Sequence, residues 1–244
     1  MTLIRIASYN VRGLRDDRSA LLRVIRGLGA DVLCLQEVPR LAFWRRRRAL
    51  LAESAGLRPA AGVRVGGVAV AVSPRVRVLA DASAPLRGFA RLERRALALA
   101  AVEVDGERLV VGSVHLDLHG GARLAHAAEI AGRVAALRRA HGARAVLAGD
   151  LNEGPDGPVW RYLGRGYADA GAACGNLTFP ARGPRARIDG ILVGEGLRVV
   201  SCGVARADPG DLRAASDHLP VVAEVEPDQG SAPSGPEIPV RFSH

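Results

Sequence analysis

Six short segments of the chain each place a carboxylate, an imidazole or a carboxamide at the end of an apolar run. In chain order they are Ser8-Tyr9-Asn10, Leu35-Gln36-Glu37, His115-Leu116-Asp117, Gly149-Asp150-Leu151-Asn152, Arg187-Ile188-Asp189 and Ser216-Asp217-His218. Short apolar runs predict buried strands, and strand ends that converge build an active site. These residue types suit metal-assisted attack of water on a phosphate ester, because hard divalent cations take carboxylate and carboxamide oxygens while His and Asp handle protons.

The length and the hydrophobic content favour one globular domain. The chain has 244 residues, 48% of them hydrophobic, and its first 226 residues contain neither a low-complexity linker nor a repeat at a fixed period. We therefore expect a single domain over residues 1–226. Residues 227–244 are rich in Pro, Gly and Ser, and this composition predicts a disordered tail.

The N-terminal segment and the cysteines bear on location. Residues 1–6 enter a strand pattern directly, without the charged and then apolar regions of a secretory signal. No run reaches the ~18 apolar residues that a membrane span needs. The cysteines Cys34, Cys174 and Cys202 are an odd number, which favours reduced thiols over a disulfide framework or a metal site. We expect a cytoplasmic monomer without stable insertion in a membrane.

The net charge of +9 reflects 34 basic residues, all of them Arg, against 25 acidic ones. A basic protein attracts polyanions such as nucleic acid or anionic lipid head groups. The chain is also rich in Ala, Gly and Val, so genomic base composition is an equally good explanation for Arg in place of Lys. The charge is therefore weak evidence for nucleic acid. The run Arg45 to Arg48 lies in a helical pattern, and a solvated helix face is expected there rather than a contact with an anionic substrate.

Hydrophobic periodicity predicts more strands than helices. Strands are expected over residues 3–11, 30–38, 65–73, 75–79, 96–104, 108–116, 143–148, 187–193, 197–205 and 219–225. A helix capped by Asp16, Asp17 or Ser19 should end at Gly29, a second should cover residues 41–54, and the longest should cover residues 121–140. The dipeptide Asp105-Gly106 predicts a hairpin turn. Two packed sheets with helices outside fit this pattern better than a doubly wound parallel sheet.

The longest helix has a predicted buried stripe and flanking histidines. The stripe consists of Leu124, Ala128, Ala131, Ala135 and Leu137. His126 and His141 are expected at the surface.

Taken together and in this order, the six segments resemble the endonuclease/exonuclease/phosphatase superfamily, which includes DNase I, abasic-site endonucleases of the exonuclease III type, sphingomyelinases and inositol polyphosphate 5-phosphatases. The resemblance runs from Ile4 to about Glu226, and its specificity lies in the set of segments, with Gly149-Asp150-Leu151-Asn152 as the most specific match. It implies an α+β fold of the DNase I type, a four-layer α/β/β/α sandwich with two packed mixed sheets flanked by helices.

The resemblance implies a site for Mg2+ or Mn2+. Glu37 would be the principal ligand, Asn10 would help to position the metal, and Asp217 would bind it directly or through water. Without the resemblance, Glu37 would be a solvated residue at a strand end and Asn10 a turn cap.

The resemblance also implies the catalytic residues. Asp150 would orient or deprotonate the attacking water, and Asn152 would bind the phosphate or that water. Asp189 would hold the imidazole of His218, and His115 would donate a hydrogen bond to the phosphate or assist the leaving group. Whether Asp150 or the pair of His218 and Asp189 takes the proton stays open. A satisfied core histidine and ordinary turn chemistry are the alternatives.

These expectations describe a metal-dependent phosphoesterase that hydrolyses phosphodiester bonds by in-line attack of water, with a nuclease as one form of it. The rivals are a phosphoesterase for lipids, inositol phosphates or other small molecules, and, less favoured, a binding module without catalysis. Val11-Arg12 after Asn10 and Gly190 after Asp189 depart from the abasic-site endonucleases, and the segment between Asn152 and Asp189 is short. That specialised activity is therefore not expected.

Overall fold

The computed structural model describes residues 2–228. In chain order its elements are β1 (Ile4–Asn10), the 3₁₀ turn η1 (Arg12–Leu14), α1 (Arg18–Leu28), β2 (Val32–Gln36), α2 (Trp44–Ser54), β3 (Arg58–Ala61), the 3₁₀ turn η2 (Val65–Gly67), β4 (Ala69–Val72), β5 (Val76–Asp81), β6 (Ala84–Pro85), β7 (Ala96–Val104), β8 (Glu107–His115), α3 (Gly120–His141), β9 (Arg144–Asp150), α4 (Pro158–Leu163), β10 (Tyr167–Asp169), β11 (Asp189–Gly194), β12 (Leu197–Val204), α5 (Pro209–Ala215) and β13 (Val221–Pro227).

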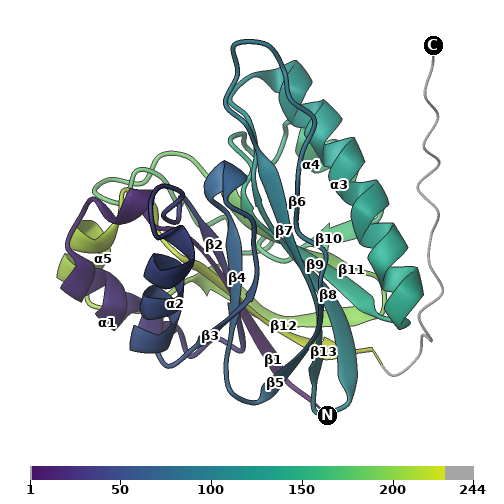
Figure 1. Cartoon of the computed structure of the whole chain (residues 1–244), viewed down its shortest axis with the longest axis horizontal. Coiled ribbons are helices and arrows are strands. Elements are labelled where there is room, and N and C mark those ends of the chain that lie inside the picture. The colour runs from purple at the N-terminus through teal and green to yellow at the C-terminus, as the bar shows by residue number, and fades with distance from the viewer. Residues whose placement is uncertain (1, 229–244) are drawn as a thin grey trace.

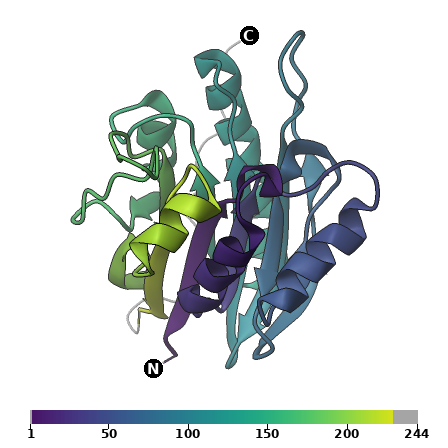
Figure 2. The ribbon, with the colours of Figure 1, turned by 90° about the vertical axis from the view of Figure 1, so that its left-hand side faces the viewer.

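Two mixed β-sheets pack face to face, and helices cover the outer face of each sheet (Figure 1). The strand order is β12-β13-β1-β2-β4-β3 in the first sheet and β10-β11-β9-β8-β7-β5 in the second, where β6 also pairs with β7. Helices α3 and α4 lie over the second sheet, and Figure 2 shows α1, α2 and α5 over the first. The predicted four-layer α/β/β/α sandwich is confirmed.

Strand β7 illustrates how the layers pack. Its even-numbered residues from Ala96 to Val104 join the core between the two sheets, whereas Leu97, Leu99 and Ala101 join the core beneath α3 and α4. Side chains of a strand point alternately to its two faces, so one set faces the other sheet and the next set faces the helices. Both faces are buried, which explains why the strands are almost continuous apolar runs in the sequence.

Strand direction gathers polar residues at one edge of the sandwich. The pairs β1–β2 and β8–β9 are parallel, so Asn10 ends beside Gln36, and His115 ends beside Asp150. Strand β11 is antiparallel to β9 and therefore begins where β9 ends, with Asp189 opposite Asp150. Three of the predicted site residues thus become neighbours through strand register alone.

The predicted ends of α1 and the predicted hairpin turn at Asp105-Gly106 are confirmed. Of the three candidate caps of α1, Asp17 is the N-cap, and its side chain accepts hydrogen bonds from two backbone N–H groups of the first turn. Gly29 ends α1 with a φ of 57°. In the β7–β8 hairpin, Asp105 and Gly106 have φ values of 47° and 86°, as a tight hairpin turn requires.

The predicted buried stripe of α3 is confirmed for Ala131 and in part for Leu137, which packs against the core beneath this helix, and is wrong for the other three residues. Leu124 is exposed, while Ala128, Ala135 and Leu137 are only half-buried. The buried residues of α3 are Ala122, His126, Ala127, Ile130, Ala131 and Val134. The error has a physical reason. Ala residues occur on all sides of α3, so its apolar face is poorly defined in the sequence.

The surface position expected for His126 is also wrong. The segment between β6 and β7 folds over α3 and covers this residue. The Nε2 atom of His126 lies 2.8 Å from the carbonyl oxygen of Arg87, and its ring packs edge-on against Phe89. His141, at the end of α3, is half-buried.

Two further segments differ from the prediction. The strand expected over residues 65–73 begins only at Ala69, because Gly66 and Gly67 adopt φ values of 74° and 62° and form η2. The solvated face expected for the Arg run is wrong for Arg48, whose buried guanidinium donates hydrogen bonds to three backbone carbonyls. Arg45, Arg46 and Arg47 are exposed as expected.

The three cysteines are free, with Cys34 in the core. Strand β13 continues to Pro227, and the N–H of Asp228 donates to the carbonyl of Gly196. The rest of the predicted tail, residues 229–244, lies outside the described residues. Between residues 2 and 228, no helix has both the length and the apolar character needed to cross a membrane.

Candidate active site

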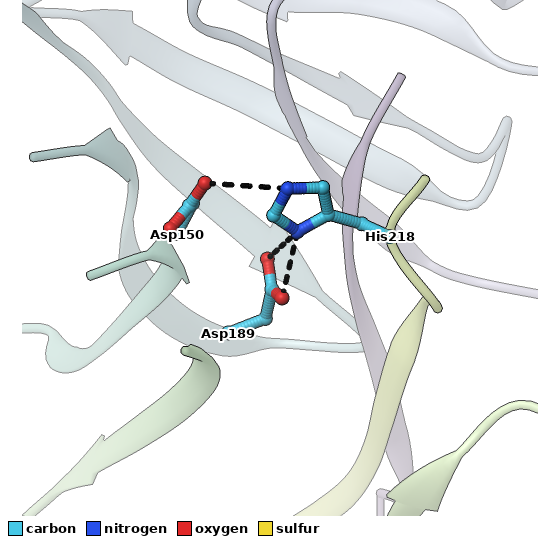
Figure 3. Close-up of side chains that lie close together, drawn as sticks. All are labelled: Asp150, Asp189 and His218. Carbon is cyan, nitrogen blue, oxygen red and sulfur yellow. Dashed lines mark hydrogen bonds and ion pairs between the residues drawn. The ribbon is translucent and has the colours of Figure 1, made fainter. Parts of the chain in front are cut away.

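His218 and Asp189 form a buried pair at this edge of the sandwich (Figure 3). The Nδ1 atom of His218 lies 2.9 Å from Oδ2 and 3.2 Å from Oδ1 of Asp189. Because a carboxylate accepts at Nδ1, that nitrogen carries a proton, and Nε2 faces Oδ2 of Asp150 at 3.8 Å. The Oγ1 atom of Thr178 accepts a hydrogen bond from the N–H of Asp189 at 3.3 Å and fixes the start of β11.

The surroundings raise the pKa of both His218 and Asp150. Burial lowers the pKa of His218, but the hydrogen bond and charge of Asp189, together with the charges of Asp150 and Asp217, raise it to about 9. Burial and the charge of Asp189 raise the pKa of Asp150 to about 7, although the charge of His218 acts in the opposite direction. Buried groups with shifted pKa values that contact one another are typical of sites that move protons.

Two asparagines hold the carboxylate of Asp150. The Nδ2 atom of Asn10 donates to Oδ2 of Asp150 at 3.1 Å and to Oε1 of Glu37 at 3.2 Å. The Oδ1 atom of Asn10 accepts from the N–H of Arg12 at 3.0 Å, which fixes the orientation of the carboxamide. The backbone N–H of Asn152 donates to Oδ1 of Asp150 at 2.9 Å. Both oxygens of Asp150 are therefore positioned.

Glu37 follows β2 with a φ of 52°, a left-handed conformation that costs on the order of 1 kcal/mol for a residue with a side chain. Its carboxylate is half-buried and accepts a hydrogen bond from Asn10. Within residues 2–228 it forms no ion pair with an Arg or His side chain. A carboxylate in strained backbone without a cationic partner is the feature expected of a group that binds a cation.

His115 approaches Asp150 from the neighbouring strand β8. Its Nε2 atom lies 3.5 Å from Oδ2 of Asp150. Burial, assisted by the positive charges of Arg95 and His218, lowers the pKa of His115 well below its ordinary value. The imidazole is therefore neutral at pH 7 and can donate one hydrogen bond to a phosphate oxygen.

Asp217 and Asn152 lie at the same edge with other partners. The Oδ2 atom of Asp217 is 3.2 Å from Nε of Arg12, and its carboxylate is partly exposed. Asn152 has a φ of 52°, and its Nδ2 atom donates to the carbonyl of Leu116 at 2.9 Å. The metal contact predicted for Asp217 and the phosphate contact predicted for Asn152 stay predictions.

Two groups of side chains at this edge offer ligands for a divalent cation. Asp150, Asp189 and His218 present ligand atoms within 4.8 Å of one another. Both oxygens of Asp189 already accept from Nδ1 of His218, so a cation there would compete with the ring proton. Glu37 supplies carboxylate oxygens, and its partner there is the neutral Nδ2 group of Asn10 rather than an imidazole that carries a proton. The group at Glu37 therefore fits Mg2+ or Mn2+ better.

Sequence reasoning assigned no role to several polar residues that support the site. Gln36 in the first sheet donates from Nε2 to Oγ of Ser113 in the second sheet at 3.1 Å, so a buried polar contact links the sheets. Ser216 donates from Oγ to the carbonyl of Asn10 at 2.7 Å and accepts from the N–H of His218 at 3.2 Å. A polar residue inside an apolar run was the available signal for Gln36 and Ser113.

Comparison with known proteins relates this geometry to one family. The model described as "Endonuclease/Exonuclease/phosphatase family" matches residues 7–218. An endonuclease/exonuclease/phosphatase from Bacteroides vulgatus superposes with a TM-score of 0.78 at 18% identity, over 93% of this chain and 100% of that chain. The mannosyl-6-phosphatase Bt3783 of Bacteroides thetaiotaomicron gives 0.76 at 19% identity, over 91% and 99%. The human Nocturnin catalytic domain with bound sulfate gives 0.74 at 18% identity, over 93% and 95%.

At these identities the likeness to solved structures is a likeness of fold, and no curated protein sequence matches the chain. The family match is broader evidence, because it extends from β1 to His218 and includes all eight predicted site residues. The chain therefore belongs to the Endonuclease/Exonuclease/phosphatase family, whose members are phosphoester hydrolases.

Proposed function

We propose that the protein is a metal-dependent phosphodiesterase in which water attacks the phosphorus in line with the leaving group. The observation that supports this most strongly is the convergence of the His218–Asp189 pair with Asp150 and a neutral His115. Such a group combines the carboxylate of Asp150, which can accept a proton from the water, with hydrogen-bond donors for the phosphate.

Proton transfer rests on Asp150 and His218. Asp150 is oriented through both of its oxygens by Asn10 and Asn152, so it can hold the attacking water in one position. Asp189 orients the ring of His218 and stabilises its protonated form through Nδ1. His115 donates a hydrogen bond to a phosphate oxygen or assists the leaving group, and Asn152 contacts the phosphate or the water.

Glu37 is the centre of the proposed site for the divalent cation. Glu37 would be its principal ligand and Asp217 would bind it directly or through water, because carboxylate oxygens are ligands that Mg2+ and Mn2+ prefer. Asn10, which donates from Nδ2 to Glu37, would help to position the metal by holding that carboxylate. When bound, the cation neutralises charge on a non-bridging phosphate oxygen and on the leaving group.

The substrate has two candidate classes. A nuclease is supported by the net charge of +9, which favours binding of a polyanion. A phosphoesterase for a small molecule, an inositol phosphate or a lipid is supported by a cleft of about 450 Å³ beside Glu37. We further propose that the protein acts as a cytoplasmic monomer.

A substrate screen tests this function. Phosphodiesters, phosphomonoesters and lipid phosphoesters would be incubated with the purified protein in Mg2+ and in Mn2+, with Asp150→Asn as the inactive control. We expect metal-dependent hydrolysis of a phosphodiester by the natural sequence and its loss in Asp150→Asn. The proposal fails if no phosphoester is hydrolysed, or if Asp150→Asn is as active as the natural sequence.

A further inference from the structure

A cleft of about 450 Å³ opens beside Glu37 and His115. Its lining includes Arg15, Glu37, Arg47, Gly66, Arg95 and His115. Ligand pockets for small molecules usually have volumes of ~300–1,000 Å³. The cleft therefore extends the candidate active site by a space that suits a small molecule.

The charge of this cleft is unbalanced. Four arginines line it, namely Arg15, Arg40, Arg47 and Arg95, but only two carboxylates do. Arg40 forms an ion pair with Glu93, and Glu37 is the proposed metal ligand. Within residues 2–228, the side chains of Arg15 and Arg47 form no hydrogen bond or ion pair. The cleft therefore presents cationic groups that an anion can bind.

Arg95 is the buried member of this set. It is only 5% exposed, and its Nε atom has no hydrogen-bond partner. The carboxylates of Glu93 and Asp117 lie 3.5 Å from Nη2 and 3.8 Å from Nε, beyond good hydrogen-bond distance. A buried guanidinium N–H without a partner is costly, and Arg95 lines the cleft, so its guanidinium would gain from an anion bound there.

The backbone around Arg95 keeps this residue in place. Gly66 packs against the start of β7, where a Cβ atom would lie 2.5 Å from the nitrogen of Ala96 and 3.0 Å from the carbonyl carbon of Arg95. Gly66 also has a φ of 74°. Only glycine fits this close approach without strain, so η2, whose Gly66 and Gly67 line the cleft, packs against the backbone of Arg95.

We propose that the cleft lined by Arg15, Arg47 and Arg95 binds a second anionic group of the substrate, a phosphate or a carboxylate, while the scissile phosphate lies at Glu37 and His115. The substrate is thus a small phosphoester that carries two anionic groups. This inference rests on the proposed function. The neighbouring phosphate of a nucleic-acid strand offers similar chemistry, and the volume of the cleft favours the small molecule.

A matched pair of substrates tests the inference. Thymidine 5′-(p-nitrophenyl phosphate) carries one anionic group, and the same compound with a 3′-phosphate carries two. We expect kcat/KM to be about 10-fold or more higher for the second compound, the gain typical of one charge-assisted contact. The double substitution Arg15→Gln, Arg47→Gln should remove this preference. Arg46→Gln, an exposed neighbour on α2 outside the cleft, should retain it.

Binding gives a readout that does not need turnover. Calorimetric titration of the metal-free protein with inorganic pyrophosphate should show binding that weakens about 10-fold in the double variant and not in Arg46→Gln. Arg95→Lys should also weaken binding, and circular dichroism would confirm that this variant is folded.

The outcomes separate the inference from the proposed function. If both thymidine compounds are hydrolysed equally well, or if the double variant binds pyrophosphate normally, the cleft is no anion site although the enzyme is a phosphoesterase. If a thymidine oligonucleotide is preferred over both compounds by about 100-fold, the second anion belongs to a polymer and the small-molecule claim is overturned. If no phosphoester of the screen, these two compounds included, is hydrolysed but the Arg-dependent pyrophosphate binding is found, the proposed function fails and the anion site stands.

Discussion

The imidazole of His218 and the carboxylate of Asp189 meet at 2.9 Å although the strands next to them belong to different sheets. His218 lies just before β13 in the first sheet, and Asp189 is the first residue of β11 in the second. The pair therefore forms only when the two sheets are packed. Asn10 and Asp150 make a second contact of this kind between β1 and β9, at 3.1 Å. The candidate site is a property of the interface between the sheets.

This pairing predicts non-additive effects on catalysis. His218→Ala and Asp189→Asn should each lower kcat by ~10²–10⁴-fold with little change in KM, because their interactions form mainly in the transition state. The double variant should lose no more than the worse single variant. Steady-state kinetics of the three variants would check this. A loss in the double variant equal to the sum of the single effects in free energy would mean that the two residues act independently.

The same contact predicts the ionisation of His218 in the metal-free protein. Its pKa, raised from 6.5 to about 9, should fall when Asp189→Asn removes the hydrogen-bonded charge. Because the folded-state value is raised, the stability that the protonated ring contributes is complete below pH 6.5 and is lost as the pH rises through about 9. An NMR titration of the imidazole signals would measure this, with His218→Gln for assignment. A value near 6.5 that Asp189→Asn leaves unchanged would contradict the account.

Gly149 should be intolerant of any side chain. A Cβ atom there would overlap the carbonyl of Val114 on β8, next to the His115–Asp150 contact. Gly149→Ala should therefore destabilise the fold by at least ~2 kcal/mol. Gly132 in α3 is a matched control with open space around it, and Gly132→Ala should stabilise the protein by ~0.5–1 kcal/mol. Urea unfolding followed by circular dichroism compares the two, and equal effects would refute the packing argument.

The sequence predicted the gathering of site residues because each of them stands at the end of an apolar run. Register then brings His115, Asp150 and Asp189 together, and the residue types at Asn10 and Glu37 follow the family pattern. The Asp-Gly hairpin and the Asp17 cap were predictable for a similar reason, since their signals are local. Chemistry at strand ends and turns is visible in the sequence because it depends on few residues.

The remaining features depend on packing between distant segments. His126 is buried only because the segment that contains Phe89 folds over α3, and Arg48 is buried only because three backbone carbonyls converge on it. Arg95 could not be identified from the sequence, because its place in the cleft depends on the packing of Gly66 in η2 against the start of β7. The short elements β3, β10, α4 and α5 carry too few residues for a clear period.

Gly190, which departs from the abasic-site endonucleases, lies against the ring of Trp160, where a larger residue would not fit.

Glu37 predicts how activity depends on the metal. Glu37→Gln keeps the size of the side chain but removes its charge, so it should weaken the binding of Mn2+ and lower turnover by ~100-fold or more. Glu53→Gln, at an exposed position of α2, makes the same chemical change away from the site and should have no effect on either quantity. Isothermal titration with Mn2+ compares the two variants, and equal affinities would remove Glu37 from the metal site.

The dependence of phosphodiester hydrolysis on a divalent cation tests the central claim most directly. Hydrolysis of bis(p-nitrophenyl) phosphate by the purified protein would be measured with Mg2+ or Mn2+, then with excess chelator, then after the metal is restored. The account predicts turnover with the metal, loss of turnover in chelator and recovery on restoration, all absent in the His218→Ala, Asp150→Asn variant. Full activity in excess chelator, or equal activity in that variant, would contradict it.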